Sequence, residues 1–309
     1  LWLCYGAIHG PTTPADRHRG KLAGNAAPTP QDIFGPWPDK PAYLDATRAW
    51  VPGPDGRPMK RVGRKSDSKR SRQGRGYDAW VQQVNECTMA LDEGVGRVLD
   101  ALEESGQASR TLVVYTADQG YGLGEHGFNQ KVAPYDATIA SPLIMRQPGI
   151  IPRGKVCRHP VNSPDLVELF RRVAGVSIPW KTHGRDITPL LRDPENTRDS
   201  PVLLTHTGRS YGSDTDAIPT DGRLTDTSGV PWYAMLRHGK FKYIRTFVAG
   251  ETEELYDLDA DTEELENLAK RPEHRGLLEA MRVKAIEELL RTDARFADSM
   301  PPTRAAGPN

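Results

Sequence analysis

The sequence is poor in the features that mark several large protein classes. It has only three cysteines in 309 residues, and none forms a C-x-x-C pair, so a disulfide framework is not expected. Lys+Arg and Asp+Glu number 41 each, so the net charge gives no reason to expect a nucleic-acid or membrane partner. No run reaches the about 18 consecutive apolar residues of a transmembrane helix. With 29 glycines and 26 prolines, the composition indicates a loop-rich globular protein.

The chain also lacks an initiating methionine. It begins with the apolar segment 1–8, which has the pattern of a core strand and runs into His9. Because chain termini usually lie at the surface, we expect the sequence to be the C-terminal portion of a longer protein. The missing signal peptide therefore says nothing about localisation.

The most informative segment is residues 111–149. The apolar, β-branched run 112–115 predicts a buried parallel strand, and Asp118-Gln119 follow at its carboxyl end. In open α/β sheets, ligands and catalytic groups gather at that edge. A glycine-rich loop with Glu125, His126 and Lys131 comes next, and then a second apolar run, 143–145. This arrangement favours a metal-assisted site for an anionic substrate.

The first two thirds of the sequence predict an α/β domain over residues 1–198. Residues 11–77 are predicted to form a long irregular insertion that ends in a basic run, 57–75. This basic run is either a solvated loop or a binding site for an anionic polymer. Apolar spacings of three and four predict a helix over 78–104, followed by a strand over 111–116. Ser163, Pro164 and Asp165 predict the start of another helix, with Ser163 as its cap, and Gly175 predicts its end. Residues 184–191 predict a short helix or turn.

The last third predicts a small α+β subdomain over residues 199–298. Strand-like runs occupy 202–204, 232–236, 241–246 and 254–256, with a hairpin signal at 237–239. An amphipathic helix is expected over 273–290. The proline-rich tail, 299–309, is expected to be disordered.

Five side chains are candidates for chemistry. Asp118 and Gln119 offer adjacent carboxylate and amide oxygens, which suit a hard cation such as calcium rather than zinc, although an Asp at a strand end is often only a turn or cap residue. Lys131 is either a surface charge or a cation that neutralises an oxyanion. His126, between two glycines, is either structural or a substrate contact. His9 shares an edge with Asp118 if their two strands are parallel.

The sequence resembles the type I, formylglycine-dependent sulfatases of the alkaline-phosphatase-like superfamily. The run YTADQGYGLGEHGFNQKVAPYDATIASPLIMRQPG is similar to that family's second metal-and-sulfate segment, above all in its iduronate-sulfatase and choline-sulfatase-like branches. Three other segments also resemble this family: His9-Gly10-Pro11, residues 92–97, and 240–243 together with 254–258. The implied fold class is α/β, a partial alkaline-phosphatase-like layered sheet with a small C-terminal α+β subdomain.

Residue roles follow from this resemblance. It implies that Asp118 and Gln119 are calcium ligands, although the family more often has His or Asn at the second position. It implies that Lys131 binds the sulfate group and assists the leaving oxygen, that His9 contacts sulfate beside it, and that His126 contacts substrate. A periplasmic or secreted location and a small-molecule or saccharide sulfate ester as substrate are the family expectation.

One part of the family pattern is missing from the sequence. The nucleophile motif C/S-x-P/A-x-R, whose Cys or Ser becomes formylglycine, does not occur, and neither does its upstream pair of metal-binding aspartates. We therefore expect this chain alone to be inactive, and the complete enzyme to hydrolyse a sulfate ester or sulfamate. The alternatives are a phosphatase or phosphodiesterase of the same superfamily, and a non-catalytic binding protein that keeps the fold.

Overall fold

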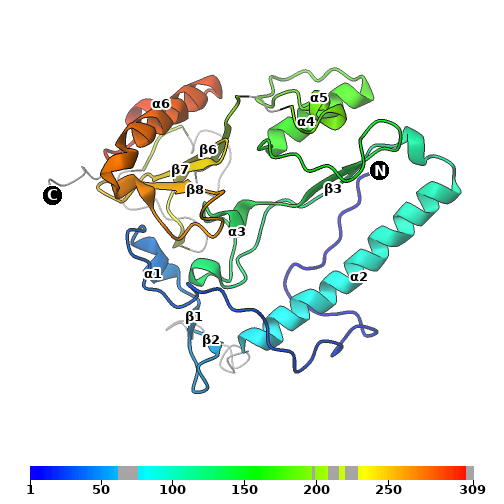
Figure 1. The fold of residues 1–309 in the computed structure, drawn as a ribbon, viewed down its shortest axis with the longest axis horizontal. Coiled ribbons are helices and arrows are strands. Elements are labelled where there is room, and N and C mark those ends of the chain that lie inside the picture. The colour runs from blue at the N-terminus through cyan, green and yellow to red at the C-terminus, as the bar shows by residue number, and fades with distance from the viewer. Residues whose placement is uncertain (62–75, 197–198, 208–215, 220–228, 304–309) are drawn as a thin grey trace. The chain divides into compact units, whose positions relative to one another are not determined.

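The structure, a computed structural model, describes residues 1–61, 76–196, 199–207, 216–219 and 229–303, which form two compact units (Figure 1). The first unit comprises residues 1–35, 48–113 and 122–129, and the second comprises 36–47, 114–121 and 130–309. The predicted domain boundary between 198 and 199 lies beside residues outside the described ranges, so it stays a prediction. The predicted disorder of the tail 299–309 is wrong for its first residues, because Ser299 ends a 3₁₀ helix and the Gly250 N–H donates to the Pro302 carbonyl, 3.2 Å away, whereas 304–309 lie outside the described residues.

The first unit is built around a long helix, α2 (Tyr77–Glu104), within one residue of the predicted start. Its first turns pack against a small hairpin of β1 (Trp50–Pro52) and β2 (Pro58–Lys60). The Trp50 and Tyr77 rings meet edge to face, with centroids 5.2 Å apart. This unit also holds the short 3₁₀ helices η1 (Ala108–Arg110) and η2 (Glu125–Gly127).

The segment predicted as an irregular insertion contains regular structure, so that prediction was wrong in part. Besides the hairpin it holds helix α1 (Tyr43–Thr47), which belongs to the second unit. The hairpin turn closes where the Gly53 N–H donates to the Arg57 carbonyl, 2.8 Å away, and Gly56 takes a φ of 77°. The high proline and glycine content concealed this turn. Arg57 pairs with Asp78, whereas residues 62–75 of the basic run lie outside the described residues.

Residues 1–8 do not form a strand, which corrects the prediction made from their apolar pattern. All eight are exposed, and His9 closes a turn by donating its N–H to the Gly6 carbonyl, 3.1 Å away. A strand needs a hydrogen-bonding neighbour, and within the described residues none pairs with this segment. Apolar character alone therefore did not determine its conformation.

Strands β3 (Val113–Thr116) and β4 (Leu143–Arg146) lie where the sequence predicts strands, and they pair with each other. Their predicted burial is incomplete, because β3 is half-buried and the Leu143 and Ile144 side chains are 38% and 62% exposed. Among the described strands these two pair only with each other, and so narrow a sheet leaves apolar side chains uncovered.

Two helices follow β4. Helix α4 (Ser163–Ala174) ends at Gly175 in the left-handed conformation, as predicted, but its cap is Asn162 rather than Ser163. The Asn162 side chain accepts from the Asp165 N–H, and the Asp165 carboxylate accepts from the Asn162 N–H, 3.1 Å away. This reciprocal box satisfies two free helix-end donors, which a lone serine would not do. Helix α5 (Thr188–Arg192) begins four residues later than predicted.

The predicted antiparallel sheet and its covering helix are present in the second unit. Strands β5 (Val202–His206), β6 (Tyr233–His238), β7 (Phe241–Thr246) and β8 (Glu254–Asp257) pair in chain order, and His238 opposes Phe241 across the tight turn. Helix α6 (Arg275–Arg291) packs on the sheet through Leu278, Met281 and Ala285 (Figure 1). Among the described residues, three further short helices are η5 (Leu268–Lys270), η6 (Pro272–His274) and η7 (Ala297–Ser299).

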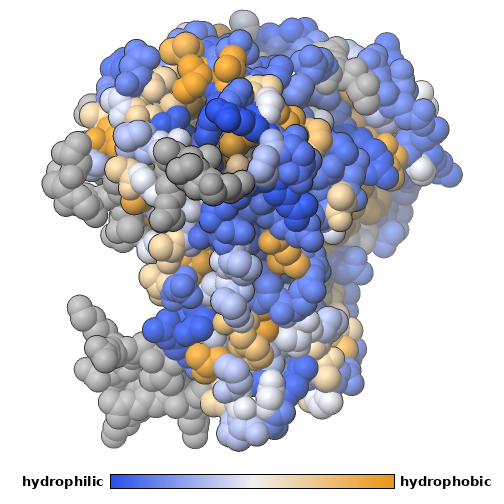
Figure 2. Space-filling view, turned by 60° about the vertical axis from the view of Figure 1, so that its left-hand side comes forward, coloured by the Kyte–Doolittle hydropathy of each residue, from blue (hydrophilic) through white to orange (hydrophobic). Residues whose placement is uncertain are grey.

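The surface is largely hydrophilic on the face that Figure 2 shows, where hydrophobic residues lie in small groups. This agrees with the 27% of residues that are charged. In the ranges that the structure describes, no helix has both the length and the apolar character to cross a bilayer.

Two arginines on α4 make the contribution of one carboxylate to stability depend on pH. Hydrogen bonds from Arg171, and then from Arg172, lower the pKa of Glu168 to about 2. A carboxylate whose folded pKa is lowered contributes stability above its unfolded pKa, and that contribution is lost as the pH falls through the folded value. We expect unfolding measured between about pH 5 and pH 2 to show a smaller acid-induced loss of stability in Glu168→Gln than in wild type. Equal losses in both proteins would contradict this.

Candidate active site

The predicted oxygen donors lie side by side directly after β3. The Gln119 amide nitrogen is 3.5 Å from the Asp118 carboxylate Oδ2. Asp118 is exposed and Gln119 half-buried, so solvent or a ligand reaches both. The end of β3 thus places a carboxylate and an amide at one edge, where the sequence predicts them.

Gly120, which follows Asp118 and Gln119, packs closely against helix α3 (Asp136–Ile139). A Cβ at Gly120 would lie 2.8 Å from the Ala137 carbonyl oxygen and 2.9 Å from that of Ala140. Only glycine permits so close an approach of two backbones. The position of Asp118 and Gln119 therefore depends on the position of α3.

Lys131 belongs to the same unit and lies five residues before α3. The Lys131 side chain is half-buried, and the next residue, Val132, takes a φ of 88°. A β-branched residue at positive φ is strained, and such strain persists only where the surroundings hold it. The hydroxyl of Tyr233 on β6 donates to the Val132 carbonyl oxygen, 2.7 Å away.

A buried ion cluster holds the start of α3. Lys242 on β7 is fully buried, and its Nζ lies 2.7 Å from both Asp136 Oδ1 and Glu264 Oε1. Glu264 also accepts from the Asp136 N–H, 2.6 Å away. Burial raises the pKa of Glu264, while the Lys242 ammonium lowers it. The sequence does not signal this cluster, because its three residues are widely separated and a strand lysine is ordinarily solvated.

A second buried network lies beside the first. The Tyr135 hydroxyl donates to Glu254 Oε2, 2.7 Å away, and burial raises the pKa of that carboxyl. The Lys40 ammonium lies 3.8 Å from the same oxygen, and 4.5 Å and 4.6 Å from the ring centroids of Tyr135 and Tyr256. The segment between Lys131 and α3 is thus tied to the antiparallel sheet by buried polar contacts.

The two predicted histidines belong to the first unit. His126 is buried, its Nδ1 lies 2.8 Å from Asp32 Oδ2, and its backbone N–H donates to the same oxygen. His9 is exposed, and its Nδ1 lies 3.0 Å from the Gly10 carbonyl oxygen. The second unit holds Asp118, Gln119 and Lys131, and the roles assigned to all five residues stay predictions.

The donor set at Asp118 and Gln119 suits calcium in kind but not in number. Both side chains carry oxygen atoms, which hard cations prefer, and the carboxylate is open to solvent. Calcium takes six to eight oxygens, however, and the described residues contain no group of three or more His, Cys, Asp or Glu side chains that could hold a metal. On their own, these two residues would supply only part of a calcium shell.

Weak calcium binding by this chain alone is the expected consequence. Two protein oxygens leave most of the ion's coordination to water, so calorimetry should give a Kd no tighter than about 1 mM, the weak end of protein calcium sites. Asp118→Asn, which removes the only charge of the pair, should abolish even that signal. Micromolar binding that survives Asp118→Asn would contradict the assignment.

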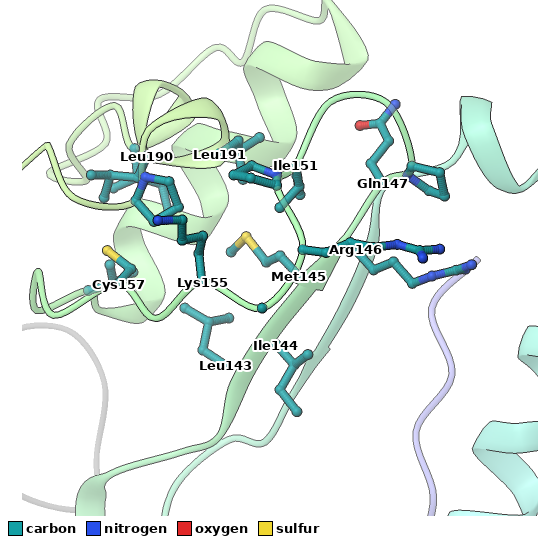
Figure 3. Close-up of a pocket in the computed structure, with 17 residues that line it drawn as sticks. Leu143, Ile144, Met145, Arg146, Gln147, Ile151, Lys155, Cys157, Leu190 and Leu191 are labelled. Atoms are coloured by element: carbon teal, nitrogen blue, oxygen red, sulfur yellow. The ribbon is translucent and has the colours of Figure 1, made fainter.

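A cavity of about 380 Å³ lies elsewhere in the second unit. It is lined by residues of β4, α5 and the segment between β4 and α4, and Figure 3 shows Met145, Ile151 and Leu191 close together in it while Arg146 extends away. No predicted site residue lines it. The cavity therefore does not belong to the candidate active site.

Known proteins similar to this chain include several sulfatases. An N-acetylglucosamine-6-O-sulfatase of Bacteroides thetaiotaomicron is 28% identical over 226 residues, which cover 73% of this chain and 38% of the relative. A choline-sulfatase of Rhizobium meliloti is 30% identical over 203 residues, covering 64% of this chain and 34% of the relative. The chain thus spans well under half the length of these relatives.

Solved structures agree on the fold. A structure described as a complex with its substrate, D-glucosamine-2-N,6-O-disulfate, superimposes with a TM-score of 0.65 at 23% identity, covering 91% of this chain and 64% of the other. A phosphonate monoester hydrolase of Silicibacter pomeroyi gives a TM-score of 0.53 at 28% identity, covering 69% of this chain and 42% of the other. The fold is α/β and alkaline-phosphatase-like. The family model described as Sulfatase matches residues 1–176, more than half of the sequence, and the chain belongs to the sulfatase family.

Proposed function

We propose that this chain carries the calcium-ligand pair and the sulfate-binding lysine of a sulfatase that hydrolyses a sulfate ester of a saccharide or other small molecule. Asp118 and Gln119 are the proposed metal ligands, Lys131 and His9 the proposed catalytic contacts, and His126 a proposed substrate contact. The complete enzyme contains a formylglycine nucleophile in this proposal.

The packing of Gly120 on α3 is the observation that supports this proposal most. It ties the oxygen donors after β3 to the segment that carries Lys131, so anionic and cationic groups belong to one supported part of the fold. The relatives named for N-acetylglucosamine 6-sulfate and choline sulfate support a sulfate ester, and the disulfated glucosamine of the solved complex supports a saccharide.

The residues of this chain would act by binding and by charge. Asp118 and Gln119 would hold calcium, which when bound supplies positive charge for the sulfate oxygens, while the formylglycine supplies the attacking oxygen. Lys131 would place an ammonium at the sulfate and at the departing oxygen, where negative charge develops as the S–O bond breaks. His9 would donate a hydrogen bond to the same sulfate. Both contacts are stronger in the transition state than in the ground state, which is what raises a rate.

A phosphonate or phosphate monoester hydrolase is the second candidate. It is favoured by the similarity to the Silicibacter pomeroyi enzyme. Phosphatases of the superfamily usually hold two metals through several His and Asp side chains, and the described residues provide no such group.

The test is an assay of the complete gene product that contains this chain. We expect it to hydrolyse an aryl sulfate, and glucosamine 6-sulfate or choline sulfate, faster than an aryl phosphate or phosphonate. Removal of calcium with a chelator should abolish the activity, and added calcium should restore it. Preference for the phosphonate would establish the second candidate instead, and absence of all these activities would leave the binding-protein alternative.

A further inference from the structure

The backbone beside Lys131 is held in an unfavourable conformation by a single side chain from the antiparallel sheet. Val132 has a φ of 88°, a region that β-branched residues avoid. Its carbonyl oxygen accepts from the hydroxyl of Tyr233, 2.7 Å away, on β6. Tyr233 is about one hundred residues away in sequence, so this hydrogen bond fixes the loop from outside.

Tyr233 is suited to this task. The residue is only 2% exposed, and Tyr233 itself pairs with His206 on β5 and with Thr246 on β7. Burial raises the pKa of the Tyr233 hydroxyl, which therefore stays protonated and remains a donor throughout the neutral range. A buried donor on a central strand is a rigid point of attachment.

The chain after Val132 is also fixed. Ala133 and Tyr135 are fully buried, and the Thr138 hydroxyl donates to the Ala133 and Tyr135 carbonyl oxygens. The strained backbone at Val132 thus lies between the fixed residues 133–138 on one side and Lys131 on the other. If the Tyr233 contact were lost, the backbone would relax at Val132, and Lys131 would move with it.

We infer that Tyr233 is a positioning residue for Lys131, acting through the strained Val132 backbone. The inference rests on the proposed function, in which Lys131 binds the sulfate. Tyr233 itself touches no substrate in this scheme, and its hydroxyl sets only where the lysine ammonium lies.

Tyr233→Phe is the direct test, because it removes the hydroxyl and keeps the ring. In the complete enzyme we expect kcat for an aryl sulfate to fall roughly 10- to 100-fold, since small misplacements of a catalytic group have effects of this size, with KM little changed. Tyr243→Phe is the matched control. It removes a buried hydroxyl from the neighbouring strand, where the hydroxyl contacts Glu253 and not the loop, so kcat should stay near wild type.

A double-mutant cycle separates positioning from general damage. In the Lys131→Ala background, Tyr233→Phe should lower kcat no further, because the group that it positions is gone. Equal effects of Tyr233→Phe with and without Lys131 would show a purely structural role and overturn the inference.

Hydrogen exchange provides a readout that does not need activity. In this chain, amide exchange over residues 131–139 should accelerate in Tyr233→Phe and not in Tyr243→Phe, with residues 241–246 unchanged in the former. Unchanged exchange over 131–139 would overturn the inference whatever the enzyme's substrate. If exchange accelerates but wild type hydrolyses no sulfate ester, the contact stands and the proposed function fails.

Discussion

Replacement of Lys131 by alanine is expected to lower kcat of the complete sulfatase about 10²- to 10⁴-fold, the range for a positioned acid or oxyanion donor. The reason is that an ammonium facing charge that develops during the reaction acts mainly in the transition state. KM should change much less than kcat. Steady-state kinetics on an aryl sulfate measures both.

Lys131→Arg sharpens this experiment. A planar guanidinium does not reproduce a compact ammonium, so we expect arginine to restore only a small part of the lost turnover. If Lys131 is instead a solvated loop charge, both variants will turn over like wild type. That result would remove the main catalytic assignment and leave Asp118 and Gln119 as the proposed site residues.

Loss of the buried lysine Lys242 is expected to have the largest effect on stability. Lys242→Met keeps the volume but leaves Glu264 buried without its cation, and breaking a buried ion pair in this way typically costs 3–5 kcal/mol, so we expect a loss of about that size. Urea or thermal unfolding measures it. Lys240→Met is the control, because Lys240 pairs with Asp257 at the surface and such pairs contribute at most about 1 kcal/mol.

The pH dependence of Lys242→Met distinguishes electrostatics from packing. Without the ammonium, burial should raise the pKa of Glu264 further above its unfolded value. A carboxyl whose folded pKa is raised favours the folded state below the unfolded pKa and loses that advantage as the pH rises. The difference in unfolding free energy between wild type and Lys242→Met should therefore shrink toward acid pH. A difference independent of pH would show that lost packing explains the effect.

Local patterns were enough to predict most of the second unit's elements. Strand-like runs and the hairpin signal at 237–239 predicted β6 and β7 to within two residues, because tight hairpins are determined by neighbouring residues, although the turn itself lies at 239–240. Three- and four-residue spacing likewise located α2. The segment 1–8 shows the limit, since apolar residues predict a strand only where a partner strand is available.

In the candidate site, too, the sequence predicts some residues and does not reveal others. Asp118, Gln119 and Lys131 stand out because unusual residue types follow a strand and flank a glycine-rich loop, and these signals are local. The contacts of Tyr233 with Val132, of Lys242 with Asp136, and of Glu264 with Asp136 join residues that are 101, 106 and 128 positions apart. A single sequence does not show which distant residues meet, so it revealed the proposed chemical groups but not the groups that hold them.

The ion cluster at α3 has a consequence for how the protein is made. Asp136 and Glu264 are 128 residues apart, and a ribosome adding about 5–20 residues per second needs roughly 6–25 s to cover that distance. During this interval the segment with Lys131 has been synthesised, while the sheet that holds it is still incomplete. The loop is then open to proteases and to wrong contacts, and it acquires its shape only when the last strands and α6 fold. The final third of the chain therefore completes the support of the segment with Lys131, which belongs to the middle third.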